Sequence, residues 1–139
     1  MPSRSVRVYQ ASSTCGGWPI SVSRSRSGSS DISVSITSKA TTAGLRVRTG
    51  VTQVPYSARG WIHKAGNDGF IKVIEDAERS VLVGASSAGP YGGEVLSALQ
   101  VAVRAEVPVA TLRNMPYAYP TFHRAIEDAL KNLSGVGSS

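Results

Sequence analysis

Apolar and polar residues alternate in two stretches before residue 55, and a period of two is typical of half-buried strands. The first stretch is Ile32–Ile36, and the second is Leu45–Arg48 together with the valines that follow it. We expect the second strand to be interrupted at Gly50 and Pro55. Between the two stretches, residues 37–44 (TSKATTAG) predict a short helix that ends at its glycine.

A β-hairpin is the clearest local prediction. Phe70–Ile74 and Val81–Val83 are apolar runs rich in β-branched residues, and the polar EDAERS between them suits a short turn. We expect Gly84 to close the second strand and SSAGPYGG to follow as a loop. That loop matches neither glycine-rich phosphate-binding pattern, so its glycines are predicted to permit a close approach of strand and helix.

Two helices are expected in the last third of the chain. Residues 94–107 (EVLSALQVAVRAEV) are apolar on nearly every side, which is typical of a buried helix. A short connecting element starts at Pro108. The last helix is predicted to begin after Pro120, with Thr121 as its N-cap, and to end at Gly135. Its apolar stripe has helical spacing and consists of Phe122, Ala125, Ile126, Ala129, Leu130 and Leu133.

These elements predict an α+β fold, a mainly antiparallel sheet with helices packed against it. The length of 139 residues fits one domain with a tail, and a hydrophobic content of 41% supports a core. The net charge of +6 is unevenly placed: residues 1–50 hold seven basic side chains and one acidic, whereas residues 51–139 hold eight of each. A basic binding face on the folded part is therefore poorly supported. Residues 1–30, rich in Ser and Arg, are expected to be disordered, and a nucleic-acid-binding tail is the weaker interpretation.

Candidate chemistry outside the last helix is sparse. The single cysteine, Cys15, excludes an intramolecular disulfide and a CxxC pair, and it favours a reducing, cytoplasmic setting. His63 is expected in a glycine-rich loop and His123 at the surface of the last helix; neither belongs to a metal-binding pattern, so no metal site is predicted. Glu127 and Asp128 are adjacent, so they point about 100° apart and suit a solvated face. No apolar run approaches the roughly 18 residues of a membrane span.

Several short motifs follow one another along the second half of the chain. They are a Gly-Phe-x-Lys, a hairpin that ends in Leu-x-Gly-Ala, a glycine before a helix that opens with Glu, and an x-Pro-Thr before the last helix. The residues that form them are Gly69, Phe70, Lys72, Leu82, Gly84, Ala85, Gly89, Glu94, Tyr119, Pro120 and Thr121. Residues 44–133 as a whole resemble the C-terminal dimerisation domain of the FAD-dependent pyridine nucleotide-disulfide oxidoreductases. This family includes dihydrolipoamide dehydrogenase, mercuric reductase and soluble transhydrogenase.

The resemblance sets the expected domain boundaries. Residues 31–43 only echo the family's first strand, and residues 1–30 show no resemblance. We therefore expect a non-homologous segment over 1–30, a dimerisation domain over 31–133 and a flexible tail over 134–139.

The resemblance also implies a homodimer in which the segment before the last helix reaches the partner's active site, beside the flavin and the redox disulfide. In the family that segment carries an acid/base His paired with a Glu; here Tyr119 and Arg124 replace them. A tyrosine, with an ordinary pKa of about 10, is a poor proton acceptor at neutral pH, but it donates a hydrogen bond. The implied site residues are Tyr119 and Tyr117 as catalytic groups, with Pro120 and Thr121 near the partner's flavin. The Tyr119–Pro120 peptide bond is expected to be cis.

FAD and NAD(P) are the family's cofactors, but the family's GxGxxG motif, its Cys-x4-Cys pair and its NAD(P) domain have no counterpart in this sequence. We therefore expect no cofactor bound to this chain alone, and whether it is an enzyme stays open. The favoured interpretation is a truncated dimerisation domain of a flavin-dependent NAD(P)H oxidoreductase, inactive by itself. One alternative is a part that docks onto a flavoprotein subunit and supplies Tyr117 and Tyr119 to its active site. Another, of a different class, is a basic-tailed nucleic-acid-binding protein.

Overall fold

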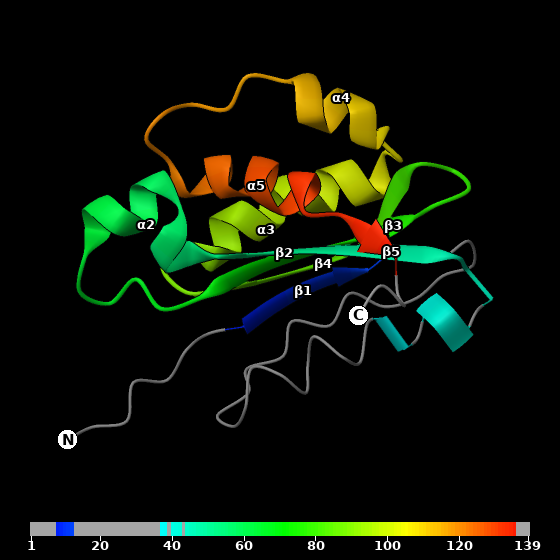
Figure 1. Ribbon diagram of the computed structural model, residues 1–139, viewed down its shortest axis with the longest axis horizontal. Helices are drawn as coiled ribbons and strands as arrows, with labels where there is room; N and C mark the ends of the chain where they lie inside the picture. Colours follow the sequence, from blue (N-terminus) through cyan, green and yellow to red (C-terminus); the bar gives the residue numbers. More distant parts are fainter. Residues whose placement is uncertain (1–7, 13–36, 39, 43, 136–139) are drawn as a thin grey trace.

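The computed structural model describes residues 8–12, 37–38, 40–42 and 44–135 of the chain (Figure 1). Within them lies one sheet of order β1-β4-β3-β2-β5, in which every neighbouring pair of strands is antiparallel. The helices that follow residue 57 lie on one side of this sheet, and the short helix within residues 37–42 lies on the other (Figure 1), so the predicted α+β architecture is confirmed. The strands are β1 (Val8–Ser12), β2 (Val47–Gln53), β3 (Phe70–Asp76), β4 (Val81–Ala88) and β5 (Ser134–Gly135).

Strand β2 runs through Gly50 without a break, so the predicted interruption there is wrong. A Cβ atom at residue 50 would overlap the carbonyl oxygen of Ala129 and lie 3.1 Å from the backbone nitrogen of Leu133. The missing side chain therefore lets helix α5 (Ala125–Lys131) lie directly against the strand. The chain does leave the sheet next to Pro55, as predicted: β2 ends at Gln53, and Pro55 lies in the 3-10 helix η1 (Val54–Tyr56) that follows.

The predicted hairpin is confirmed, and its second strand is longer than expected. Strand β4 continues past Gly84 to Ala88, and all of its residues are buried. The loop that follows is correspondingly short. Gly89 has a φ of +115°, and a Cβ there would come within 2.8 Å of the Asp68 carbonyl oxygen. The close approach is thus between the end of β4 and the segment that enters β3, rather than between strand and helix as predicted.

Helix α3 (Gly92–Arg104) is buried on one face only, although its sequence is apolar nearly all round. Val95, Leu99 and Ala102 face the core, whereas Val101 is 66% exposed. The prediction of a fully buried helix is therefore wrong for this chain taken singly. Helix α4 (Val109–Asn114) forms the connecting element after Pro108.

The last helix begins as predicted and ends earlier. A 3-10 turn, η2 (Phe122–Arg124), leads into α5, which stops at Lys131 with Asn132 as its C-cap. Gly135 does not end the helix, because Ser134–Gly135 leave it and pair with β2 as strand β5.

The predicted apolar stripe of the last helix forms the centre of the core. Phe122 and the α5 residues Ala125, Ile126, Ala129 and Leu130 are buried, and they pack together with buried residues of β3, β4 and α3. Each large side chain buried in this way contributes about 1.5–3 kcal/mol. A smaller cluster consists of Ala40, Val47, Ile74 and Val83. Packing in this main core therefore holds η2 and α5 against the sheet. It also fixes the position of the segment that precedes Phe122.

The N-terminal predictions are only partly covered. Of the segment 1–30, expected to be disordered, the structure describes Val8–Ser12 alone, and these five residues form edge strand β1 beside β4 instead. The predicted strand at Ile32–Ile36 lies outside the described residues. The predicted short helix is present in the described part of 37–42, and Gly44, at a φ of +79°, follows it. No described helix combines the length and the hydropathy of a membrane span.

Candidate functional site

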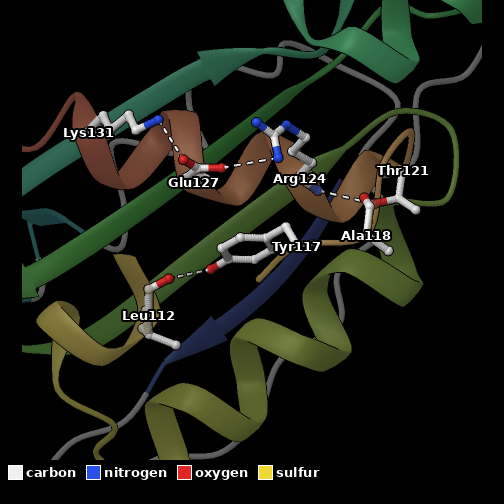
Figure 2. A network of polar contacts seen from close by, with 7 residues as sticks. All are labelled: Leu112, Tyr117, Ala118, Thr121, Arg124, Glu127 and Lys131. Atoms are coloured by element: carbon white, nitrogen blue, oxygen red, sulfur yellow. Dashed lines mark hydrogen bonds and ion pairs between the residues drawn. The ribbon is translucent and has the colours of Figure 1, made fainter. Parts of the chain in front are cut away.

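Tyr117 lies in the segment between α4 and η2 and turns inward. Its ring packs against the main core, and its hydroxyl donates a hydrogen bond of 2.9 Å to the carbonyl oxygen of Leu112 in α4 (Figure 2). Burial, and secondly the charge of Glu127, raise the pKa of Tyr117 above its ordinary value. The phenol is therefore held protonated, and its proton already has an acceptor within the fold.

Tyr119, in contrast to Tyr117, lies at the surface. Its side chain is 69% exposed. The guanidinium carbon of Arg124 lies 5.7 Å from the centre of its ring, within the range of a cation–π contact. The Tyr119–Pro120 peptide bond is cis, as predicted, and Pro120 is exposed. Of the two tyrosines predicted from the sequence, only Tyr119 presents its ring to solvent.

Thr121 caps the last helix as predicted. Its hydroxyl accepts a hydrogen bond of 3.3 Å from the backbone N–H of Arg124 and donates one of 2.6 Å to the Ala118 carbonyl oxygen (Figure 2). An N-cap of this kind satisfies one of the backbone donors left open at a helix start. The Thr121 hydroxyl is thus used twice within the chain, so a bound group would meet this residue chiefly through its methyl and backbone atoms.

Glu127 is the centre of a row of charges along the last helix. Its carboxylate lies 3.6 Å from the guanidinium of Arg124 and 2.6 Å from the ammonium of Lys131 (Figure 2). The hydrogen bond from Lys131 is the main reason that the pKa of Glu127 is lowered. Glu127 is therefore paired with two cations along one side of the last helix.

A cluster of rings around Phe122 was not anticipated from the sequence. His63 ends helix α2 (Ala58–His63) rather than lying in a loop, and its ring meets the buried ring of Phe122 edge-on at 5.6 Å. Tyr91 stacks on Phe122 at 5.5 Å, and the Arg59 guanidinium lies 5.8 Å from its centre. The available signal was Ser57, a good N-cap before a stretch in which Arg59 and His63 have helical spacing.

The remaining polar contacts at this end are structural. His123 lies in η2 rather than in the last helix proper, and its Nε2 atom is 3.2 Å from the Glu94 carbonyl oxygen. Among the described residues, no group of three or more His, Cys, Asp and Glu side chains could hold a metal ion.

Comparison with known proteins places this geometry in a family. Residues 36–130 match the family described as "Pyridine nucleotide-disulphide oxidoreductase, dimerisation domain". The chain is 32% identical over 92 residues to dihydrolipoyl dehydrogenase of Thermus scotoductus, covering 66% of this chain and 20% of that protein. It is 30% identical over 86 residues to dihydrolipoyl dehydrogenase of Corynebacterium glutamicum, covering 61% and 18%.

A solved structure agrees on the fold. The flavoprotein disulfide reductase RclA from Escherichia coli superposes with a TM-score of 0.63 at 19% identity, over 68% of this chain and 21% of that one. At this identity the likeness shows the fold alone. The chain spans about a fifth of the length of these relatives.

Proposed function

The chain belongs to the pyridine nucleotide-disulphide oxidoreductase dimerisation-domain family, and we propose that it serves as the dimerisation domain of a flavin-dependent NAD(P)H oxidoreductase. The observation that carries the proposal is the family match over residues 36–130, together with a fold in which the described residues of that range form the three central strands β2, β3 and β4 and the helices packed on them. In this proposal two copies of the chain associate, in the reducing setting that a single cysteine favours.

We further propose that the domain by itself is inactive in disulfide reduction. A catalytic disulfide needs two cysteines in one site, and this sequence has one. The contribution of the chain to chemistry would then be the rim of a site whose flavin belongs to another part of the enzyme.

Tyr119 is the residue of that rim best suited to meet a flavin or a substrate. Its ring is exposed and lies beside the cation of Arg124, whereas the Tyr117 hydroxyl donates to the Leu112 carbonyl. In this proposal Tyr119 donates a hydrogen bond and Tyr117 fixes the backbone on which Tyr119 stands. Pro120 and Thr121 complete the edge.

Sedimentation equilibrium of the whole chain, with an absorbance scan from 350 to 500 nm, tests the leading proposal. We expect a dimer in the micromolar range with no flavin band. A chain that stays monomeric up to about 1 mM, where association would contribute less than about 4 kcal/mol, contradicts the assignment.

A second candidate function is complementation in trans, favoured by the exposure of Tyr119. Here the chain docks onto a separate flavoprotein core and completes its site. The assay adds the chain to a dihydrolipoyl dehydrogenase lacking its own dimerisation domain and follows NADH oxidation. Recovery of activity that Tyr119→Phe lowers about tenfold, the effect of losing one positioned hydrogen bond, supports this function. Tyr91→Phe, which alters another exposed tyrosine, is the matched control and should leave the activity unchanged.

The nucleic-acid alternative is not proposed. Residues 51–139, which form most of the described domain, carry eight basic and eight acidic side chains. This part of the chain therefore lacks the excess positive charge that dominates non-specific nucleic-acid binding. The excess on which the tail interpretation rests is in residues 1–50, most of whose basic side chains lie outside the described residues.

A further inference from the structure

The face of the sheet that lies opposite α3 and α5 (Figure 1) carries a lysine and a serine side by side. Lys72 of β3 stands directly opposite Ser86 of β4, and the exposed Val51 of β2 lies on its other side. Val73 and Ala85, which adjoin them in sequence, are buried in the main core beneath the helices. Because successive side chains of a strand point to opposite faces, the lysine and the serine share the other face. Side chains directly opposite each other in an antiparallel pair have Cβ atoms about 4.5–5.5 Å apart, so the two are neighbours.

The Ser86 hydroxyl has no hydrogen-bond partner among the described residues, although Ser86 is only 1% exposed. A buried hydroxyl is normally hydrogen-bonded, as Ser57 is by accepting from the Gly60 N–H and donating to the Val54 carbonyl oxygen. A buried hydroxyl that lacks a partner costs stability, because it has given up its hydrogen bonds to water. A hydrogen-bond donor is therefore held beside Lys72, and no acceptor within the described residues competes for it.

The amine of Lys72 is the second part of this arrangement. The side chain is half-buried on the sheet, and this burial lowers the pKa of Lys72 below its ordinary value, because the charged form is disfavoured away from water. A larger fraction of this amine is therefore neutral at a given pH, and only the neutral form is a nucleophile. Lys64 and Lys131 are exposed, and Lys131 donates to the Glu127 carboxylate at 2.6 Å. Of the described lysines, Lys72 thus combines an amine that burial makes easier to deprotonate with a neighbouring hydroxyl.

We propose that Lys72 is a site of acylation by acyl thioesters and that the Ser86 hydroxyl assists the transfer. The lone pair of the lysine Nζ forms a bond to the thioester carbonyl carbon, and the carbonyl oxygen becomes an oxyanion to which Ser86 donates a hydrogen bond. The C–S bond then breaks, the thiolate leaves, and the proton lost from Nζ passes to the thiolate or to water. The products are an amide and a thiol, so the step needs no oxidant or reductant. A donor already in place lowers the barrier, because it stabilises charge that develops in the transition state.

Acylation also removes an unfavourable charge from this face of the sheet. The amide that replaces the ammonium of Lys72 is uncharged, so burial no longer disfavours it. Its carbonyl oxygen offers Ser86 the acceptor that the described residues do not supply. Neither a flavin nor a second copy of the chain takes part, so this site is independent of the function proposed above.

Site-resolved mass spectrometry of the whole chain tests this assignment. The chain is incubated with S-acetyl-N-acetylcysteamine, a small acetyl thioester, and peptides from samples taken over time give the rate of acetylation at each lysine. We expect Lys72 to react at least about threefold faster than Lys64, because only a neutral amine attacks the thioester. In urea strong enough to unfold the chain the two rates should become similar, because both side chains are then fully solvated.

Two serine variants separate the role of the hydroxyl from a general effect on packing. Ser86→Ala should lower the rate at Lys72 at least about tenfold, as expected for the loss of an oxyanion donor, and should leave the rate at Lys64 unchanged. Ser87→Ala is the matched control, because Ser87 is equally buried but lies on the opposite face of β4, and both rates should keep their wild-type values. Far-UV circular dichroism confirms that both variants are folded.

Three results would overturn the inference. A folded chain in which Lys72 reacts no faster than Lys64 contradicts the acylation site. An unchanged rate at Lys72 in Ser86→Ala contradicts assistance by the hydroxyl, and equal losses in Ser86→Ala and Ser87→Ala show loosened packing instead. These measurements involve neither flavin nor association, so all three results leave the proposed dimerisation standing. A chain that sediments as a monomer overturns that function and leaves the Lys72 site in place.

Discussion

Replacing Gly50 with Ala should destabilise the domain, because no space exists for a methyl group between β2 and α5. Gly50 lies in the sheet opposite Val73 of β3, with α5 directly above it. The added Cβ would overlap the carbonyl oxygen of Ala129 and press on the backbone of Leu133. Both neighbours are main-chain atoms, so the helix as a whole must move, and that helix carries the central apolar stripe of the core.

The magnitude follows from two opposing terms. Overpacking in a well-packed core costs about 1–3 kcal/mol. Replacing glycine also lowers the conformational entropy of the unfolded chain, which stabilises the folded state by about 0.4–1 kcal/mol. A net loss of about 1–2 kcal/mol is expected, out of the roughly 5–15 kcal/mol typical of a folded domain. With a urea m-value of about 1–3 kcal/mol/M, the midpoint should fall by about 1 M.

Urea unfolding followed by far-UV circular dichroism measures this loss, and two further variants sharpen it. Gly44→Ala meets no atom within 4 Å, so it reports only the cost of a left-handed backbone, about 1–2 kcal/mol. The double variant Gly50→Ala/Ala129→Gly should show no rescue, because the overlap is with the carbonyl of Ala129 and not with its methyl group. A neutral or stabilised Gly50→Ala, or a clear rescue by Ala129→Gly, would refute the reasoning.

Three further predictions concern Tyr117, the cap of the last helix and the charges along that helix. Tyr117→Phe removes the hydrogen bond to the Leu112 carbonyl and should cost about 0.5–1.5 kcal/mol in urea unfolding. Because burial raises the folded-state pKa of Tyr117, the wild type should also lose stability as pH rises above about 10, a dependence that the variant lacks. Thr121→Ala removes the N-cap and should cost about 1 kcal/mol, while Thr121→Ser should be near neutral; equal losses would contradict the capping role. The lowered pKa of Glu127 gives stability that is present above its ordinary pKa of 4.5 and is lost as pH falls through the folded-state value, so Glu127→Gln should flatten the acid limb of the stability curve. An unchanged acid limb would show that the contact with Lys131 does not persist in solution.

The local sequence pattern was sufficient to predict an element whose stabilising interactions lie mainly between residues close together in the chain. The hairpin, the Thr121 cap and the stripe on the last helix follow from periodicity and capping chemistry, and the structure confirms all three. Pattern failed where a distant segment decides the outcome. Gly50 looks like a strand breaker in the sequence, and only the position of α5 shows why glycine is required in the middle of β2.

The candidate site shows the same division. Tyr117 and Tyr119 stand close together in the sequence before a helix. The sequence pattern alone does not show which of the two side chains is buried and which is exposed. Their separation into a buried hydrogen-bond donor and an exposed ring depends on the carbonyl of Leu112 lying within reach of one and not the other. The ring cluster on Phe122 joins α2, the start of α3 and η2, which are far apart in the chain, so it was missed altogether.

The sequence by itself determined the fold class, the hairpin, the capped last helix and the family resemblance, because hydrophobic periodicity and capping act over a few residues. Tertiary structure alone decided which apolar side chains remain outside. Val101 belongs to a helix that the sequence predicts to be buried, and Trp61 is among the largest apolar side chains, yet both are exposed in the folded chain. The physical reason is that burial depends on what packs against a face, and the sheet and helices of one chain cover only one face of α3 and one face of α2.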